Sequence, residues 1–399
     1  MTMSSSRKSD LIIALALGMC IGIVYSKVNN YSKQNNNLGE AVTYFVKHDV
    51  SRYPIPEDEL RILFDTFQLK KEQYPDYARK TSKCILFPID WTFADRELRC
   101  VANTHSDFFH HNLISACLMN HDMITCKATL ARLSKNLLPK KSLEHLPKSW
   151  LLDELHTIPK LAGVLLIAKT NRQRQSSTLI FDSSDVPELQ KLHDNGIVVV
   201  QELIKSPFCI GDRKTTLRVY VLAFVSSSKR TIWRYSNGFI YYSDADYDKS
   251  LSTTSAQVAS GYSDRTVYDT RPLTLNDLWK TLSRCESAEM SAEIDNCIKN
   301  TIGLHIRNEN VIQTIPQGSF QLFGCDVLIQ NNEQPFKAFL LEVNKAPDLT
   351  YKSERDGQLK RNLINDMWRI LAEPAYLNLL SCNDHIHLQR SDNDTWLTL

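Results

Sequence analysis

Two apolar segments near the end of the chain, joined by a short polar turn, constrain the fold more than any other feature. Residues 320–329 and 336–343 are rich in Phe, Leu, Val and Ile, and residues 330–334 between them are polar. Short β-prone runs separated by a polar turn are typical of two adjacent strands. The pattern therefore predicts a strand pair in which alternate side chains point to opposite faces.

Three polar side chains fall at matching places on this strand pair. Glu342 and Asn344 are two residues apart and so share one face of their strand, while Asp326 lies on the neighbouring strand and can face the same cleft. Two carboxylates and an amide oxygen on rigid strands suit Mg²⁺, with nucleotide phosphates completing its coordination. The alternative for such a pattern is a buried polar group satisfied by the backbone.

The rest of the chain alternates less regularly between strands and helices. Apolar, β-prone runs predict strands at residues 84–87, 163–168, 196–203, 216–225 and 231–242. Apolar residues at helical spacing or amphipathic runs predict helices at residues 57–67, 127–138, 275–282, 291–302 and 358–372. Neither G-x-G-x-x-G nor a Walker loop is present. This mixed order favours α+β lobes over a doubly wound sheet.

The strand pair resembles the tubulin–tyrosine ligase family. Residues 320–326 are F-Q-L-F-G-C-D and residues 340–347 are L-L-E-V-N-K-A-P, whereas the family has F-x-L-F-G-x-D followed by L-I-E-V-N-x-x-P. The resemblance implies an ATP-grasp fold, in which two α+β lobes clasp ATP beside a smaller α/β N-terminal domain. It also implies that Asp326, Glu342 and Asn344 bind the magnesium ions.

Further segments match the family in the same order along the chain. They are C-K-A-T-L at residues 126–130, L-P-K-S-W at 146–150, V-V-Q-E-L-I at 199–204 and G-D-R-K-T-T-L-R at 211–218. The resemblance implies phosphate contacts from Lys127, Lys169, Lys214 and Arg218. It implies adenine contacts from Gln201, Glu202 and Leu203. Arg218 and Glu342 are the expected catalytic residues.

The function implied by the resemblance is ATP-dependent ligation of a carboxylate to an amine through an acyl phosphate. ATP and Mg²⁺ are the expected cofactors. The expected partners are an amino acid and a protein or peptide carboxylate, the tubulin tail being one possible acceptor. The residue types agree with this chemistry, because a transferring phosphoryl group needs Mg²⁺ and positioned Lys or Arg side chains.

Several positions depart from the family pattern. Thr216 replaces an aspartate, and residues 169–177 lack the glycines that let a backbone close over phosphate. Ser236 stands where the family has an arginine, and Arg234, two residues earlier, is a candidate to replace it. The alternative function is therefore a catalytically inactive, nucleotide-binding interaction module of the same fold.

The N-terminus predicts membrane attachment. Arg7 and Lys8 precede an uncharged, mostly apolar run at residues 11–26, which favours a retained single-pass anchor over a cleaved signal peptide. The charges on its two sides do not decide whether the catalytic part is cytosolic or luminal. The expected division is 1–26 anchor or signal peptide, 27–38 polar linker, 39–160 N-terminal α/β domain, 161–380 ATP-grasp domain and 381–399 polar tail.

Overall charge argues against nucleic acid as a partner. The chain carries 47 Lys and Arg against 45 Asp and Glu, a formal net charge of +2. A nucleic-acid-binding domain is usually much more basic. The ten cysteines are scattered without a C-x-x-C motif, which favours free or buried thiols over a zinc site.

Overall fold

The computed structural model describes most of the chain from residue 120 onward and four short strands before it. The described residues are 43–46, 70–71, 84–87, 113–115, 118, 120–170, 179–226, 229–248, 253–260, 265–312, 318–331, 335–345, 347–372 and 395–399. The expected anchor (1–26), the polar linker (27–38) and the helix at 57–67 lie outside them. In the part of the chain described, no helix is long and apolar enough to span a bilayer.

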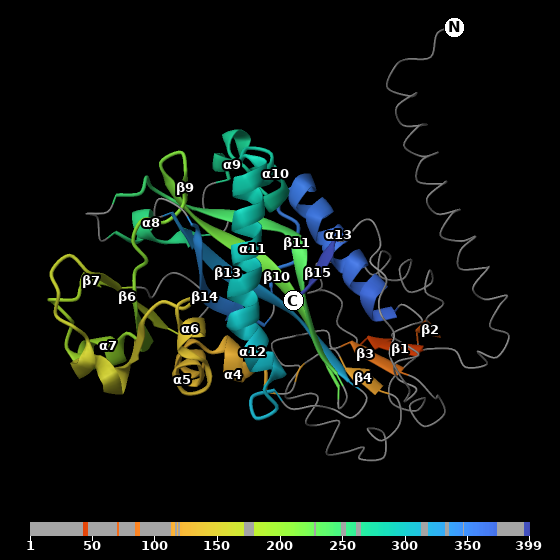
Figure 1. Ribbon diagram of the computed structural model, residues 1–399, viewed down its shortest axis with the longest axis horizontal. Coiled ribbons are helices and arrows are strands. Elements are labelled where there is room, and N and C mark those ends of the chain that lie inside the picture. Colours follow the sequence, from red (N-terminus) through yellow and green to blue (C-terminus); the bar gives the residue numbers. More distant parts are fainter. Residues whose placement is uncertain are drawn as a thin grey trace, which may run out of the picture.

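A large mixed sheet forms the centre of the molecule (Figure 1). Its strands, in chain order, are β1 (Thr43–Val46), β2 (Lys70–Lys71), β3 (Cys84–Phe87), β4 (Leu113–Ser115), β9 (Cys209–Ile210), β10 (Arg213–Val225), β11 (Arg230–Ser243), β12 (Ala259–Ser260), β13 (Ser319–Gln330), β14 (Lys337–Asn344) and β15 (Trp396–Thr398). The long strands β11, β10, β13 and β14 are antiparallel neighbours in that order. The N-terminal strands join them through β4, which runs parallel to β13.

A smaller antiparallel sheet forms a second lobe, beside helices α5, α6 and α7 in Figure 1. Its strands are β5 (Ser149–Leu151), β6 (Leu165–Thr170), β7 (Leu179–Asp182) and β8 (Ile197–Glu202), in the order β5-β8-β6-β7. Leu166, Ala168 and Val200 on one face of this sheet pack with Leu192 in a small apolar cluster. The opposite face carries Lys169, because side chains alternate along a strand.

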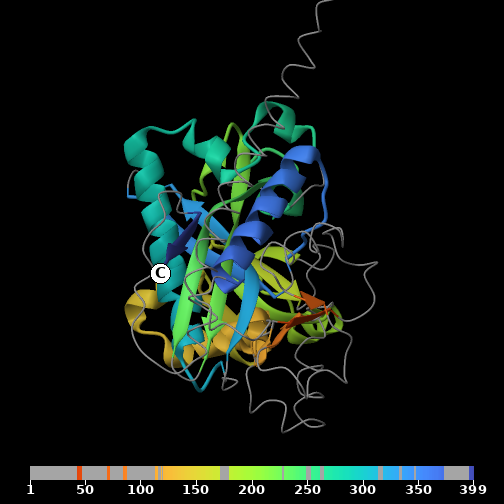
Figure 2. The same ribbon diagram turned by 90° about the vertical axis from the view of Figure 1, so that its right-hand side faces the viewer.

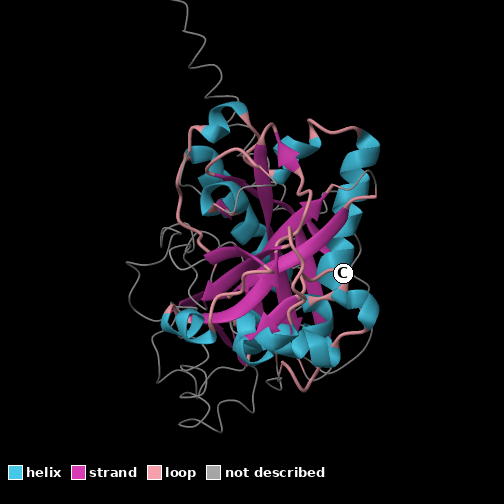
Figure 3. Ribbon diagram, turned by 90° about the vertical axis from the view of Figure 1, so that its left-hand side faces the viewer, coloured by secondary structure: helices cyan, strands magenta, loops and turns pink. Residues whose placement is uncertain are grey.

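Helices cover both faces of the large sheet (Figures 2 and 3). The two long ones are α11 (Arg284–Asn300) and α13 (Glu354–Ala372). The others are α4 (Asp122–Thr125), α5 (Lys127–Leu137), α6 (Lys140–Leu143), η4 (Leu152–Thr157), α7 (Leu189–Asp194), α8 (Thr254–Gln257), α9 (Val267–Thr270), α10 (Leu275–Trp279) and α12 (Ile302–Arg307). Figure 2 shows α11 and α13 on opposite sides of the sheet.

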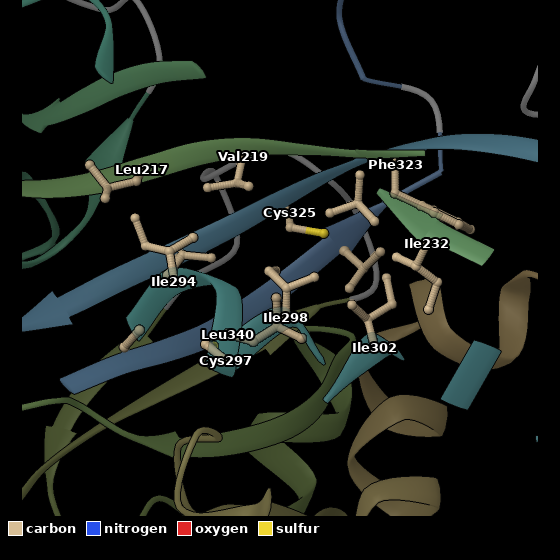
Figure 4. Packing of buried hydrophobic residues seen from close by; sticks show 14 of the residues in the cluster. Leu217, Val219, Ile232, Ile294, Cys297, Ile298, Ile302, Phe323, Cys325 and Leu340 are labelled. Atoms are coloured by element: carbon tan, nitrogen blue, oxygen red, sulfur yellow. The ribbon is translucent and has the colours of Figure 1, made fainter. Parts of the chain in front are cut away.

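The main core lies between the sheet and α11. Leu217 and Val219 of β10, Cys325 of β13 and Ile294 and Ile298 of α11 are buried together (Figure 4). Because odd-numbered residues of β10 fill this core, the even-numbered ones point to the other face. That second face carries the polar residues predicted for the site and, further along, packs against α13.

Most predicted elements are present with shifted ends. The helix expected at residues 291–302 begins at Arg284 and ends at Asn300. Its start is set by a capping box, in which Ser283 and Glu286 each accept a hydrogen bond from the other's backbone N–H. Its end is set at Thr301, where the backbone leaves the helical region and α12 begins.

Two pairings cross the expected boundaries of the domains. Strand β5 begins at Ser149, before the boundary at residue 160, and pairs with β8 in the small lobe. The last residues, expected in a polar tail, form β15 on the edge of β11, where Trp396 is buried and its ring lies 5.0 Å from that of Tyr235. Edge-strand pairing satisfies backbone groups that composition alone assigns to solvent.

Candidate active site

Three neighbouring strands bring Arg218, Asp326 and Glu342 into one row. Arg218 on β10 is opposite Asp326 on β13, and Asp326 is opposite Glu342 on β14. Directly opposed residues in antiparallel strands are close enough for their side chains to interact. The two carboxylates from distant parts of the sequence therefore share one side of the sheet with a guanidinium.

An irregularity in β14 makes this row possible. Asp326 pairs with Glu342 and the next residue, Val327, pairs with Leu340, so Leu341 has no partner on β13. This is a β-bulge, which commonly redirects side chains beside functional sites. Leu340 and Val343 both lie in the core on the α11 side. The bulge therefore lets Glu342 point away from that core although Leu340, two residues earlier, points into it.

Asn344 lies between the two carboxylates. Its Nδ2 is 3.2 Å from Glu342 Oε1 and 3.5 Å from Asp326 Oδ2, and it donates to the Gly324 carbonyl at 3.3 Å. Two carboxylate oxygens thus converge on one point, and rotation of the amide would bring Asn344 Oδ1 there. This donor set fits a hard cation such as Mg²⁺. Within the described residues no cluster of three or more His, Cys, Asp or Glu could hold a metal.

Arg218 is fixed from several directions. Its Nε donates to Asp326 Oδ1 at 2.6 Å and one terminal nitrogen donates to Oδ2 at 3.2 Å, a bidentate pair. Its guanidinium carbon lies 5.2 Å from the centre of the Tyr241 ring. A Cβ at Gly324 would lie 3.1 Å from the guanidinium and 3.0 Å from Pro347. A larger residue at position 324 would therefore force Arg218 or Pro347 to shift by a few tenths of an ångström.

Two of the three predicted phosphate lysines act on the carboxylates, and the third lies beside one of them. Lys127, the first residue of α5, places its Nζ 3.1 Å from Glu342 Oε2. The Lys169 ammonium interacts electrostatically with Glu342, Asp326 and Lys127. The Lys214 ammonium is repelled by that of Lys169. Burial lowers the pKa of both Lys169 and Lys214 to about 8. Among the described residues, neither of these two lysines forms an ion pair with a carboxylate.

The pKa values of the two carboxylates are shifted in opposite directions. Burial raises the pKa of Asp326 to about 6, an effect that Arg218 opposes and Glu342 reinforces. Burial acts on Glu342 too, but Lys127, Lys169 and Arg218 outweigh it and hold the pKa of Glu342 at about 2. The difference follows from position, because Glu342 lies beside more lysines than Asp326 does. Glu342 is therefore ionised at neutral pH.

The residues predicted to flank adenine lie at the end of β8. Gln201 is opposite Ile167 on β6, two positions from Lys169, so it shares the face that carries this lysine. Gln201 Nε2 donates to Ser149 Oγ at 2.9 Å, while its buried Oε1 has no partner among the described residues. Glu202 lies 3.6 Å from Lys148, and Leu203 is buried. An unpaired amide oxygen can accept from an exocyclic amino group.

Arg234 does not contact this site. Its guanidinium is buried and forms an ion pair with Asp295, and it donates to Ser291 Oγ at 2.9 Å, both on α11. The expectation that Arg234 replaces the family arginine is therefore wrong. The physical reason is the face it occupies, since Arg234 lies opposite Val221 on the side of β11 that Ile232 and Ile240 share, and this side packs into the core with α11.

Two site-supporting residues were not predicted from sequence. Gln321 is fully buried, and its Nε2 donates to the Lys345 carbonyl at 2.7 Å, just after the end of β14. Tyr241 supplies the ring beside Arg218. A polar Gln inside an apolar strand was the available signal for the first.

Thr216 is buried, and residues 171–178 of the expected phosphate loop lie outside the described residues.

Comparison with a solved structure defines the class of fold. The chain superposes on the C-terminal domain of Pby1 from K. lactis, described as an ATP-grasp enzyme, with a TM-score of 0.58 and 16% identity. The alignment covers 90% of this chain and 98% of that one. The two-lobed arrangement is thus an ATP-grasp fold.

The family follows from the sequence profile of the tubulin-tyrosine ligase family, which matches residues 111–376. The chain belongs to this family. It is 24% identical over 224 residues to tubulin glycylase 3B of Drosophila melanogaster, covering 52% of this chain and 29% of that protein. It is 29% identical over 188 residues to the probable tubulin polyglutamylase TTLL9 of Bos taurus, covering 45% and 39%. The chain thus matches less than half the length of these relatives.

Proposed function

We propose that this chain is an ATP-dependent ligase that joins an amino acid to a protein or peptide carboxylate through an acyl phosphate. The observation that carries this proposal is the pair of lysines behind the carboxylates, Lys169, which is partly buried, and Lys214, which is buried, neither of them in an ion pair with a carboxylate among the described residues. An ammonium group removed from water and not held in a close ion pair is costly. A polyanion such as the triphosphate of ATP would compensate both of them.

The roles of the residues follow from their chemistry. Lys127, Lys169 and Lys214 hold phosphate oxygens as point charges, whereas the Arg218 fork can hold the γ-phosphate or the substrate carboxylate. Asp326, Glu342 and Asn344 would hold Mg²⁺, which supplies charge neutralisation to the transferring phosphoryl group. Arg218 and Glu342 are the proposed catalytic residues. Binding, orientation and charge stabilisation suffice, because phosphoryl transfer of this kind requires no protein nucleophile.

The proposed acceptor is a protein carboxylate, with tubulin tails as the first candidates. The relatives named above are described as a tubulin glycylase and a probable tubulin polyglutamylase. Glycine and glutamate are therefore the first amino acids to test, followed by tyrosine.

The test combines ATP binding with ligation in one set of proteins. The 399-residue chain is titrated with ATP in a calorimeter with and without Mg²⁺, then assayed with tubulin and radiolabelled amino acids. Glu342→Gln removes one proposed metal oxygen charge and should abolish ligation while the thermal unfolding curve stays close to wild type. The matched control is Glu309→Gln, at an exposed residue outside the site, which should retain activity.

The outcomes separate the two candidate functions. Ligation that survives Glu342→Gln at the wild-type rate contradicts the proposed metal residue. Tight ATP binding without ligation of any tested amino acid favours an inactive nucleotide-binding interaction module instead. Absence of ATP binding by the folded chain contradicts both functions.

Membrane attachment through residues 11–26 remains part of the proposal. A chain lacking these residues should become extractable from membranes at alkaline pH, whereas the intact chain should stay in the pellet. Protease protection on sealed membranes then reports whether the ligase domain, proposed at 161–380 with its N-terminal domain at 39–160, is cytosolic or luminal.

A further inference from the structure

The candidate site carries more positive than negative charge before any ligand binds. Asp326 and Glu342 provide two negative charges. Lys127, Lys169 and Arg218 act on them directly, and a fourth cation, Lys214, lies beside Lys169. With pKa values near 8, Lys169 and Lys214 are mostly protonated at pH 7. The excess of two positive charges lies in a part-buried region, where Coulomb interactions are screened less than in bulk water.

The carboxylates that would bind a divalent cation already bind protein cations. Both oxygens of Asp326 accept from Arg218, at 2.6 and 3.2 Å, and Glu342 Oε2 lies 3.1 Å from Lys127 Nζ. Asn344 Nδ2 lies 3.2 Å from Glu342 Oε1 and 3.5 Å from Asp326 Oδ2, the oxygen that also accepts from Arg218. A bare divalent cation must therefore compete with three fixed donors and also enter a positive field.

A nucleotide meets the opposite situation. Lys169 and Lys214 offer ammonium groups without a carboxylate ion pair among the described residues. Phosphate oxygens can also draw Lys127 and Arg218 away from the carboxylates. Both side chains are long, and a triphosphate carries more negative charge than a carboxylate. The same event that neutralises the lysines would release carboxylate oxygens for a metal.

We propose that the nucleotide creates the divalent-metal site, so that ATP binds without metal and the metal binds well only once ATP is present. The inference rests on the proposed function, because it assumes that ATP occupies this site. It adds a strong positive coupling between the two ligands, and by thermodynamic reciprocity the metal must tighten ATP binding by the same factor.

Two binding measurements on the intact chain test the coupling without an activity assay. Mn²⁺ replaces Mg²⁺ because both prefer oxygen ligands, and free Mn²⁺ is counted by electron paramagnetic resonance. ATP affinity is measured by calorimetry in EDTA. We expect ATP to bind in EDTA. We also expect Mn²⁺ affinity to rise at least about tenfold when a non-hydrolysable ATP analogue saturates the protein, within the usual range for coupled sites.

Variants that remove one positive charge distinguish nucleotide-coupled metal binding from metal binding that is independent of nucleotide. Lys127→Gln frees Glu342 and should raise Mn²⁺ affinity without nucleotide about tenfold, the usual strength of a contact to a charged group. Lys214→Gln touches neither carboxylate, so it should raise Mn²⁺ affinity less and weaken ATP binding. Lys280→Gln is the matched control, since this lysine is exposed and, among the described residues, its ion pair with Asp277 is as long as 4.0 Å. Thermal unfolding identifies any variant that does not fold.

The possible results are distinct. Tight Mn²⁺ binding to the nucleotide-free wild-type chain, unchanged by Lys127→Gln, overturns the coupling but leaves ATP binding intact. A folded chain that binds no ATP in EDTA or with metal overturns the proposed function itself. Weak Mn²⁺ binding that both nucleotide and Lys127→Gln strengthen supports the inference.

Discussion

Buried lysines distinguish this site at the scale of single residues. Lys214 is 3% exposed and lies in the field of another cation, Lys169. A charged group in this position lowers the stability of the folded chain, because water is lost without a compensating carboxylate. Such a cost is expected where the compensation comes from a ligand.

The first prediction is that Lys214→Met stabilises the protein and weakens ATP binding. Methionine keeps a similar length and apolar stem but removes the buried charge. We expect the free energy of unfolding at pH 7 to rise by about 1–3 kcal/mol, the scale set by the lowered pKa. Chemical denaturation and calorimetry of the same preparation measure the two effects. A loss of stability at pH 7 would contradict the proposed role.

The gain in stability should depend on pH. An exposed lysine has an ordinary pKa of 10.5, whereas burial lowers the pKa of Lys214 to about 8 in the folded protein. Between these values the unfolded chain binds more protons, so wild-type stability rises with pH. The advantage of Lys214→Met is therefore full below pH 8 and disappears towards pH 10.5. Lys191→Met, at an exposed lysine of α7, should show no such dependence.

At the scale of elements, helix α13 anchors the segment that follows strand β14. Lys360 and Asp356 form a buried ion pair of 2.9 Å within this helix. Lys360 Nζ also donates to the Thr350 carbonyl at 2.6 Å, and Asp356 Oδ2 accepts from the Lys352 backbone N–H at 2.7 Å. The pair thus joins the helix to residues 350–352, a few residues beyond Asn344.

The second prediction concerns this anchor. Asp356→Asn leaves the Lys360 ammonium buried without its counter-ion, and we expect a loss of about 3–5 kcal/mol in the free energy of unfolding. Adding Lys360→Met should recover much of that loss, because a buried ion pair can be replaced by apolar side chains at small cost. Urea denaturation of the wild type, single and double variants measures both steps. Equal stability of the single and double variants would show that the pair is not coupled.

At the scale of the whole molecule, the candidate site needs both lobes. Lys169 and Gln201 come from the small sheet, whereas Lys214, Arg218 and the carboxylates come from the large one. A ligand in contact with both must hold the lobes together. Ligand binding to the folded state alone raises stability in proportion to the logarithm of its concentration.

The third prediction is that Mg-ATP at about 100 times its dissociation constant stabilises the chain by about 2.7 kcal/mol. Thermal unfolding with and without Mg-ATP measures the shift. Lys169→Met removes the charge that the small lobe contributes and should reduce the shift at a fixed ATP concentration. The exposed variant Lys191→Met in the same lobe should retain it. Equal shifts in both variants would place the ligand away from Lys169.

The sequence alone determined much of the local structure. The strands around Asp326 and Glu342 and the helix that begins at Lys127 follow from apolar periodicity, which depends only on near neighbours in the chain. The motif residues then indicated the ATP-grasp fold, which the comparison with a solved structure supports. The roles of the individual site residues remain predictions.

Tertiary structure decided which faces these residues occupy. Alternation along β14 predicts the same face for Leu340 and Glu342, and only the unpaired Leu341 separates them. In β11 the face shared by Ile232 and Ile240 packs against α11, and Arg234 lies on it and pairs with Asp295 of that helix. Bulges arise from pairing between segments far apart in sequence, so a period counted along one strand does not contain them. For the same reason the pairing of β15 with β11 was decided only by the fold.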